Sequence, residues 1–239
     1  MLYFRVELCV KTKGVRNMNV KEKLKELVPP YAILPIGLVA TLNFSAYYIS
    51  KIIIEDREKY DLSIPLDDII PLVTPFIFIY VLAFAQWAIG YLVLVKQSRK
   101  CCSRVAAANI IAKMLCFIIF ITVPTAIVRP EVTGGGFSAF LTRFIYAADT
   151  PVNLFPSIHC LESYCIMRFS LGEKKIPVWY KIVMSVFTVL VFASVLFTRQ
   201  HIFVDIPGGI LMLEIGILVS RLTGFDKVFD RKKKGNELN

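Results

Sequence analysis

The chain has 239 residues, of which 56% are hydrophobic and 19% are charged, and its mean hydropathy is +0.62. This composition excludes an ordinary soluble protein, because the apolar residues fall in long blocks that can cross a hydrocarbon core of about 30 Å. The formal net charge of +10 does not indicate nucleic-acid binding. The lysines and arginines stand at the ends of the apolar blocks and form no single basic face.

Six apolar blocks predict an all-α fold, an integral membrane bundle of six helices. In chain order they cover about residues 31–54, 69–95, 105–128, 157–171, 177–198 and 202–222. The fourth block has roughly 15 residues, which reach only about 23 Å at the rise of an α-helix. Because this is too short to cross a bilayer alone, we expect its start to be recessed within the bundle or in a water-filled cleft.

The charge distribution predicts the side of the membrane that each connection faces. Lysines and arginines are concentrated before the first block, after the second, fourth and sixth blocks, and the connection from Glu55 to Asp68 is acidic. The positive-inside rule then places both termini in the cytoplasm. We therefore expect a basic cytoplasmic segment (1–30), a six-span membrane domain (31–222) and a basic cytoplasmic tail (223–239).

The six cysteines form no Cys-x-x-Cys pair and have no metal-ligand spacing. We expect neither a disulfide framework nor a metal site from them. The first 30 residues contain no apolar segment followed by a small-residue cleavage site, so a cleaved signal peptide is not expected.

His159 and His201 are the two histidines of the chain, and each stands at the start of a predicted span. Pro156 and Ser157 precede His159 and are typical of the first turn of a helix. The free N–H groups and the dipole of such a helix end attract phosphate. His159 is therefore expected two residues from an anion site, where Ser157 is a phosphate contact or only a helix cap.

The second histidine is followed, four residues later, by a carboxylate. On a helix, His201 and Asp205 would share one face. A carboxylate inside a span is costly unless it is paired, so Asp205 is expected to accept a hydrogen bond from Nδ1–H of His201. The other ring nitrogen, Nε2, would then be the basic one.

Two arginines fall on the same predicted side of the membrane as both histidines. Arg129 ends the third predicted span and Arg199 lies just before His201. Guanidinium groups neutralise phosphate oxygens, and the set therefore predicts phosphoryl transfer, in which one histidine attacks phosphorus and the other protonates the leaving oxygen. The alternative is structural: buried hydrogen-bonding histidines, and arginines that anchor span ends at lipid headgroups.

Three segments carry a resemblance to a known family. Phe-Pro-Ser-Ile-His (155–159), Arg-Gln-His-Ile-Phe-Val-Asp (199–205) and Arg-Pro (129–130) resemble the motifs of the type 2 phosphatidic acid phosphatase superfamily, in particular its inositol-phosphorylceramide-synthase-like branch. The resemblance covers roughly residues 129–209 and the six-span layout. It implies the catalytic residues His201 (nucleophile), Asp205 (its orienting partner) and His159 (general acid), and the phosphate-binding residues Arg129, Ser157 and Arg199.

The chain departs from the family pattern at two positions. The superfamily usually has a lysine seven residues before the arginine of Arg-Pro, where this chain has Thr122, and often an arginine where this chain has Val195. Lys113 would lie about 13 Å from Thr122 along a helix, and we expect it to extend toward the cytoplasmic face. Glu162 is expected to bond another helix in preference to orienting His159.

The sequence thus predicts a membrane enzyme that acts on a lipid phosphate at the outer face through a phosphohistidine, with membrane lipids as its surroundings and no cofactor or nucleic-acid partner. The resemblance implies phosphatidic acid, phosphatidylglycerol phosphate or an isoprenyl diphosphate as substrate, and a bacterial plasma membrane. Water as acceptor gives a phosphatase, which we favour because water needs no dedicated pocket; a hydroxyl acceptor gives a headgroup phosphotransferase. From a different class, the chain could be a non-catalytic lipid-binding or transport protein.

Overall fold

The computed structural model describes residues 28–230, which are largely helical and contain no β-sheet, only two isolated bridges. The all-α fold predicted from the sequence is therefore confirmed. The helices are α2 (Pro30–Ile53), α3 (Pro65–Ile69), η1 (Thr74–Phe76), α4 (Ile77–Gln97), α5 (Arg99–Thr122), α6 (Phe137–Ala148), α7 (Ile158–Gly172), α8 (Val178–Phe197), α9 (Asp205–Leu222) and η2 (Phe225–Asp230). Residues 1–27 of the predicted N-terminal segment and 231–239 of the predicted tail lie outside the described residues.

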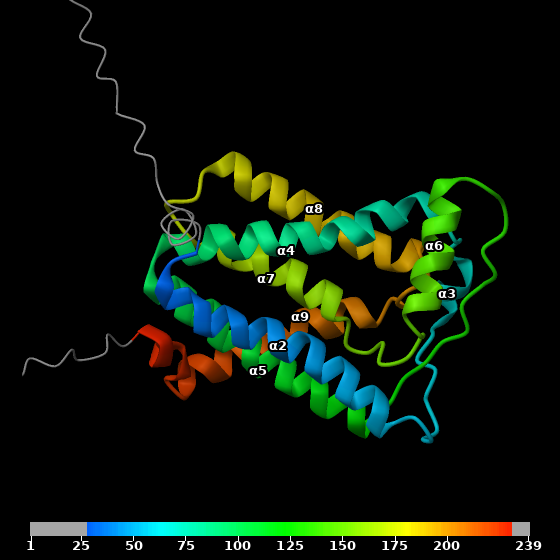
Figure 1. Cartoon of the computed structure of the whole chain (residues 1–239), viewed down its shortest axis with the longest axis horizontal. Coiled ribbons are helices and arrows are strands. Elements are labelled where there is room, and N and C mark those ends of the chain that lie inside the picture. The colour runs from blue at the N-terminus through cyan, green and yellow to red at the C-terminus, as the bar shows by residue number, and fades with distance from the viewer. Residues whose placement is uncertain (1–27, 231–239) are drawn as a thin grey trace, which may run out of the picture.

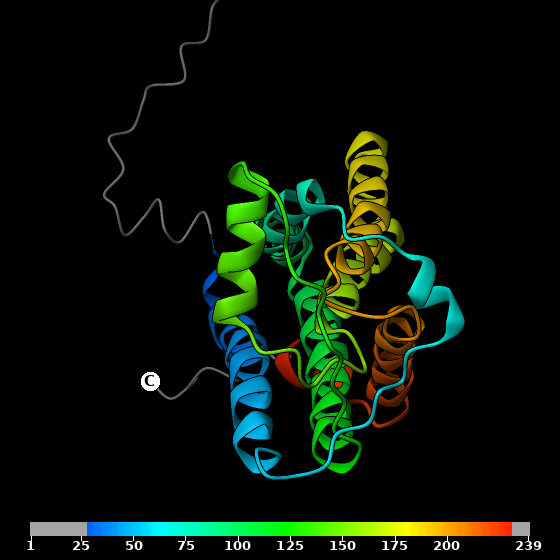
Figure 2. The same ribbon diagram turned by 90° about the vertical axis from the view of Figure 1, so that its right-hand side faces the viewer.

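The long helices run side by side along one axis, and α6 crosses them at one end (Figures 1 and 2). Within residues 28–230, four helical segments are long and apolar enough to span a membrane: α2, η1 with α4, α5 and α8. The chain is therefore a membrane protein. The remaining two long helices are shorter or more polar, since α7 has only 15 residues and α9 carries three ionisable side chains along its 18 residues.

The short helix α7 lies at the centre of the bundle, where it packs against α4, α8 and α9 (Figure 1). Its apolar residues Leu161, Cys165 and Ile166 are fully buried, and so is Ser157 at its start. A short helix needs no contact with lipid at its ends when its neighbours enclose it. The recessed start that we expected for the fourth block is what the structure has.

Three of the six predicted spans have wrong boundaries. The second span was expected from residue 69, but its helical segment begins with η1 at Thr74 and continues through α4 to Gln97. The third span was expected at 105–128, but α5 begins at Arg99 because the Ser98 side chain caps it by accepting the Cys101 N–H, and it ends at Thr122, two residues before Pro124. Residues 123–130 are extended, so Arg129 lies in a loop segment and does not end a helix. The sixth span was expected from 202, whereas α9 begins at Asp205.

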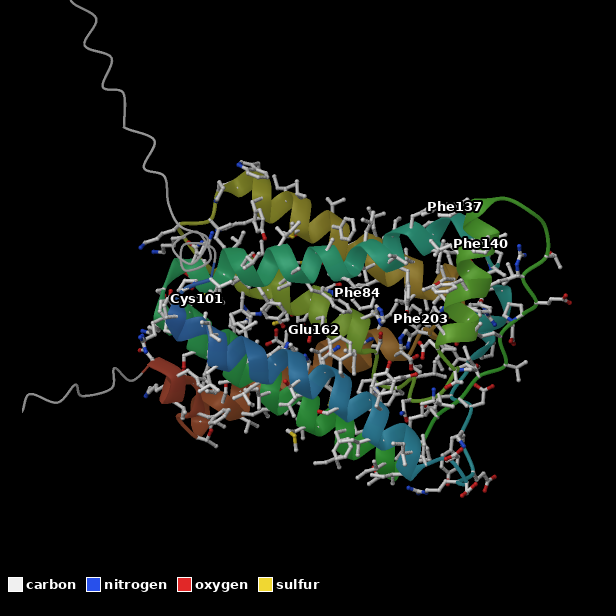
Figure 3. All side chains as sticks on the ribbon, in the orientation of Figure 1. Phe84, Cys101, Phe137, Phe140, Glu162 and Phe203 are labelled. Carbon is white, nitrogen blue, oxygen red and sulfur yellow. The ribbon has the colours of Figure 1, made fainter. Side chains whose placement is uncertain are left out.

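The helix α6 was not predicted, since its 12 residues are too few for a span. It buries Ala139 and Thr142 and leaves Phe144 exposed, together with Phe137 and Phe140, which Figure 3 labels. The Tyr146 hydroxyl donates a hydrogen bond of 2.8 Å to the carbonyl of Thr198. Burial raises the pKa of this phenol, so it stays a protonated donor. The helix α6 is thereby fixed to the end of α8.

A buried ion pair joins the helices midway along the bundle, near Glu162 in Figure 3. Lys113 Nζ lies 2.5 Å from Glu162 Oε1 and donates to the carbonyl of Val39 at 2.9 Å. Glu162 Oε2 also accepts the Tyr91 hydroxyl at 2.5 Å. The expectation that Lys113 extends to the cytoplasmic face is wrong because its ammonium group is neutralised inside the bundle, at 2% exposure. The expectation that Glu162 bonds other helices is confirmed.

We expect Lys113→Met to destabilise the bundle strongly, because Glu162 would be left as an unpaired buried charge, at a cost of about 3–5 kcal/mol. The double variant Lys113→Met, Glu162→Gln should recover most of that loss, since it removes both charges. Thermal unfolding in detergent measures the difference. A single variant as stable as the wild type would show that the pair contributes nothing.

Candidate active site

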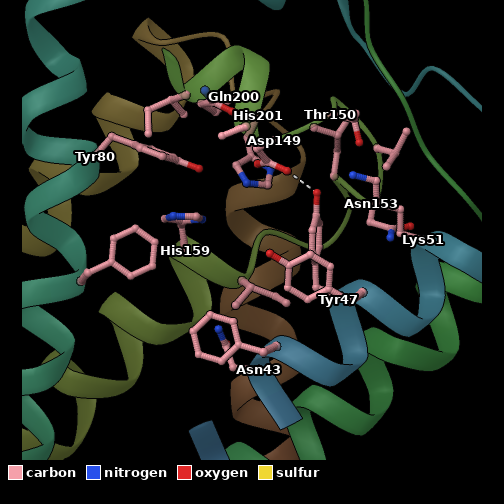
Figure 4. Close-up of a pocket in the computed structure, with 18 of the residues that line it drawn as sticks. Asn43, Tyr47, Lys51, Tyr80, Asp149, Thr150, Asn153, His159, Gln200 and His201 are labelled. Carbon is pink, nitrogen blue, oxygen red and sulfur yellow. Dashed lines mark hydrogen bonds between the residues drawn. The ribbon is translucent and has the colours of Figure 1, made fainter. Parts of the chain in front are cut away.

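A cavity of about 240 Å³ lies near the end of the bundle that α6 crosses (Figure 4). Its walls come from the second half of α2, the first half of α4, the C-terminal end of α6 with the loop that follows it, the first turn of α7, and the turn before α9. The polar residues among them are Asn43, Tyr47, Tyr48, Lys51, Tyr80, Arg129, Asp149, Thr150, Asn153, His159, Gln200 and His201. Both histidines therefore face one cavity, as the sequence predicted.

The buried carboxylate of Asp205 contacts the His201 ring and holds it in place. His201 Nδ1 lies 2.9 Å from Asp205 Oδ2, which also accepts the Ile202 N–H at 3.1 Å. Asp205 is fully buried, while the imidazole keeps 10% exposure. The expected contact is present, although His201 lies in the turn before α9 and not on a shared helix face. With Nδ1 engaged, Nε2 is the nitrogen left for chemistry.

His159 sits in a wall of aromatic side chains. Its ring stacks on Tyr80 with centroids 4.3 Å apart, and Trp87 and Phe84 lie at 5.1 and 5.6 Å. Its Nε2 is buried and has no hydrogen-bond partner among the described residues. The centroids of the His159 and His201 rings are 6.0 Å apart. The aromatic contacts fix the orientation of this imidazole without using its nitrogens.

Arg129 brings a guanidinium group to this cavity. It donates to the carbonyl of Asp149 at 2.5 Å and to the side-chain oxygen of Gln200. The guanidinium also stacks on the Tyr146 ring, 4.6 Å from its centroid. Two hydrogen bonds and one stacking contact hold the guanidinium beside the residue that precedes His201, where it can neutralise an anion.

The other two predicted phosphate ligands are not among the side chains that line this described cavity. Ser157 is fully buried, and its hydroxyl caps α7 by accepting the Cys160 N–H at 3.3 Å. Arg199 donates to the carbonyls of Asp67 and Ile70. It adopts a positive φ of 52°, which turns the chain between α8 and His201. In this geometry Ser157 acts as a helix cap and Arg199 as a loop anchor.

Glycines allow α9 to approach the Phe-Pro-Ser segment closely. A Cβ at Gly209 would lie 2.5 Å from the carbonyl oxygen of Ser157, and one at Gly208 would lie 2.5 Å from the Phe155 ring. The Ser157 N–H donates to the carbonyl of Asp205 at 3.2 Å. This contact between the two motif segments sets the position of His201 relative to His159.

Sequence reasoning missed the wall that α2 contributes. Asn43, Tyr47 and Lys51 line the cavity, and Tyr47 donates a hydrogen bond to Asp149 Oδ1, drawn as a dashed line in Figure 4. The signal was available, because polar residues at intervals of four within an apolar span mark one helix face.

No family model matches the chain, and no curated protein or solved structure is found to be similar to it. The resemblance to the type 2 phosphatidic acid phosphatase superfamily therefore rests on the motif residues themselves.

We expect neutral His201 to carry its proton on Nδ1, the less common tautomer, because Asp205 accepts a hydrogen bond there. Nitrogen-15 NMR at about pH 8.5, above the usual titration range of histidine, reads the tautomer directly. Only two histidines contribute signals, and His159→Gln assigns them. Asp205→Asn should shift the population toward Nε2–H. A wild-type His201 protonated on Nε2 would contradict the proposed orientation.

Proposed function

We propose that this chain is a metal-independent lipid-phosphate phosphatase, similar to the type 2 phosphatidic acid phosphatase superfamily, that works through a phosphohistidine. The observation that supports it is the convergence of His201, oriented by buried Asp205, with His159 and Arg129 on one cavity. A nucleophile with an orienting carboxylate, a second imidazole and a fixed cation are the groups that phosphoryl transfer needs.

The proposed topology has six crossings, with both termini in the cytoplasm. α7 is counted as a crossing because α4, α8 and α9 surround it, and α9 because it packs along α5 and α7. Basic residues stand where α4 meets α5 (Lys96, Arg99 and Lys100) and in the connection from α7 to α8 (Lys174 and Lys175). Both lie at the end away from the cavity, whereas the acidic connection 55–68 lies at the cavity end. The positive-inside rule favours a cavity at the extracytoplasmic face. The family resemblance favours a bacterial plasma membrane.

The chemistry would proceed in two steps. In the first, His201 Nε2 attacks phosphorus, the bond from phosphorus to the lipid oxygen breaks, and His159 gives that oxygen a proton. In the second, water attacks phosphorus, its proton goes to His159, and the phosphorus–nitrogen bond breaks to release phosphate. Arg129 would neutralise the charge on the phosphoryl oxygens, and Asp205 would stabilise the imidazolium of His201.

The lipid character of the substrate is supported by the apolar rim. Phe44, Tyr48 and Phe84 line the cavity and are 58%, 59% and 47% exposed, on surfaces that would face acyl chains. A phosphate headgroup can reach the histidines while its chains stay among the lipids. Phosphatidic acid, phosphatidylglycerol phosphate and isoprenyl diphosphates all meet this requirement.

We expect detergent-purified protein to release inorganic phosphate from a panel of these lipids with EDTA present. His201→Ala should abolish release and His159→Ala should lower it by about 10²–10⁴-fold, the usual contribution of a general acid. Wild type should also carry an acid-labile phosphate that His201→Ala lacks. Folded wild-type protein that releases no phosphate from any lipid of the panel would contradict the phosphatase proposal.

The two arginines should behave differently. Arg129→Ala is expected to lower kcat/KM by about 10²-fold or more, as loss of a cation beside the transferred group does. Arg199→Ala should chiefly lower the thermal stability, because it releases the loop anchored at Asp67 and Ile70. Arg143→Ala is the matched control, since among the described residues that guanidinium bonds the loop carbonyls of Val132 and Gly134. An equal loss of kcat/KM in Arg129→Ala and Arg199→Ala would indicate that Arg199 is a phosphate ligand after all.

A further inference from the structure

The exposed aromatic side chains of α6 form a single stripe. Phe137, Phe140 and Phe144 stand at intervals of three and four residues, which places them on one face of the helix. Each of the three is more than half exposed. The opposite face carries Ala139 and Thr142, which are buried against the bundle. Three exposed phenylalanine rings on one face of so short a helix indicate an interaction surface.

Protein contacts at both ends of α6 fix the direction in which this aromatic stripe points. At the start of the helix, the hydroxyls of Ser138 and Thr74 share a hydrogen bond of 3.0 Å. At its end, the Tyr146 hydroxyl donates to the carbonyl of Thr198. Figure 2 shows α6 at the margin of the bundle, where it lies beside α4. The stripe therefore stays on the outer surface of the protein.

The aromatic stripe continues a surface that faces lipid. The ring of Phe78, in the first turn of α4, stacks on Phe137 with centroids 5.9 Å apart, and Phe137 in turn stacks on Phe140 at 6.2 Å. The segment formed by η1 and α4 is apolar and long enough to span a membrane, and Phe78 and Leu82 are exposed on it. On a spanning helix such side chains contact acyl chains. The row of stacked rings thus leads from the lipid-facing surface of α4 onto α6.

The length and composition of α6 favour a lipid surface as its partner over a second copy of the chain. The 12 residues of the helix extend about 18 Å, which is too short to cross the hydrocarbon core. A helix with aromatic residues on one face and a cation beside them, here the exposed Arg143, is typical of helices that lie in the membrane interface. A second copy bound to the stripe would divide one continuous apolar surface, because the adjoining Phe78 and Leu82 would remain in lipid.

We propose that α6 is an interfacial helix, and that its aromatic stripe inserts among the acyl chains of the leaflet at the cavity end of the bundle. Ile145 and Ala148, near the end of the same helix, line the cavity, and the carbonyl of Asp149 accepts a hydrogen bond from Arg129. Because these residues join α6 to the cavity wall, insertion of the stripe fixes the depth of the cavity relative to the lipid headgroups. The docking is independent of the proposed phosphatase chemistry, whereas its effect on lipid turnover rests on that function.

The depth of α6 can be measured without reference to catalysis. A nitroxide label is attached at Phe140→Cys in a Cys9→Ser background, in proteoliposomes of phosphatidylcholine, since the other five cysteines are buried. Power-saturation EPR compares the access of oxygen, which dissolves in the acyl region, with the access of a water-soluble nickel chelate. We expect oxygen to reach the label and the chelate to be excluded from it, at a depth of about 5–10 Å below the headgroups.

The matched control for this label is Glu131→Cys, because that residue is exposed in the loop before α6 and its label should be reached by the chelate. Equal access of the chelate to both labels would overturn the proposal. Spin–spin broadening at residue 140 that disappears when labelled protein is diluted with unlabelled protein would assign the stripe to a second copy, and would overturn it as well.

The double variant Phe140→Ser, Phe144→Ser tests the consequence for lipid turnover. We expect it to hydrolyse long-chain phosphatidic acid in vesicles about ten-fold more slowly than the wild type, because two of the three inserted rings are lost. Its hydrolysis of water-soluble dibutyryl phosphatidic acid should be unchanged, since that substrate needs no docking to a bilayer. Trp179→Ser is the matched control, because this exposed aromatic residue lies in the first turn of α8, at the opposite end of the bundle.

The outcomes keep the two proposals apart. An equal loss on both substrates would show that the rings only stabilise the fold, and would overturn the coupling of α6 to the cavity. Folded wild-type protein that hydrolyses neither substrate would contradict the proposed phosphatase, and the EPR depth of residue 140 would then decide the interfacial helix by itself.

Discussion

A charged group at bilayer depth must find its partner inside the protein, because no water is there to solvate it. This chain contains two such buried charged sites, and they are paired in different ways. Lys113 and Glu162 satisfy each other completely, with Tyr91 and a carbonyl of α2 filling the remaining positions. Asp205 is equally buried but is paired only through Oδ2, and its partner His201 keeps a free nitrogen on the cavity. In the first arrangement all charges are paired within the protein, whereas the second leaves a ring nitrogen able to form a hydrogen bond in the cavity.

The fold joins these two centres through α7. Glu162 lies three residues after His159, so the ion pair that fixes the middle of α7 also fixes the depth of the histidine. At the start of the same helix, Gly209 lets α9 touch the backbone at Ser157. The short helix is therefore held from the side and from its end. Its imidazole needs no hydrogen bond of its own to stay in place.

Sequence patterns correctly predicted the features that depend on residues close together in the chain. Hydropathy gave α2 and α8 to within a residue or two, and the interval of four from His201 gave its contact with Asp205. Tertiary contacts decided the rest. Ser98 and Pro124 moved α5 toward the N-terminus, α6 is too short for hydropathy to detect, and the fate of Lys113 depended on a glutamate 49 residues away (162 − 113). Arg199 was assigned to phosphate because no pattern shows that carbonyls of α3 lie within its reach.

The size of the cavity limits which part of a lipid phosphate the protein could distinguish. About 240 Å³ is below the 300–1,000 Å³ of pockets that enclose drug-sized ligands, so it can admit a phosphate and a small polar group but no acyl chain. The acyl chains of the proposed substrate would then lie along the exposed aromatic side chains of α2 and α4, which would not distinguish one lipid tail from another. The polar head alone then discriminates among substrates. In the proposed function, the phosphate of that head would lie against Arg129 and the histidines, and the rest of the head would lie against the residues of α2 that line the cavity. On this proposal, the α2 wall would be the part of the site that distinguishes one lipid phosphate from another.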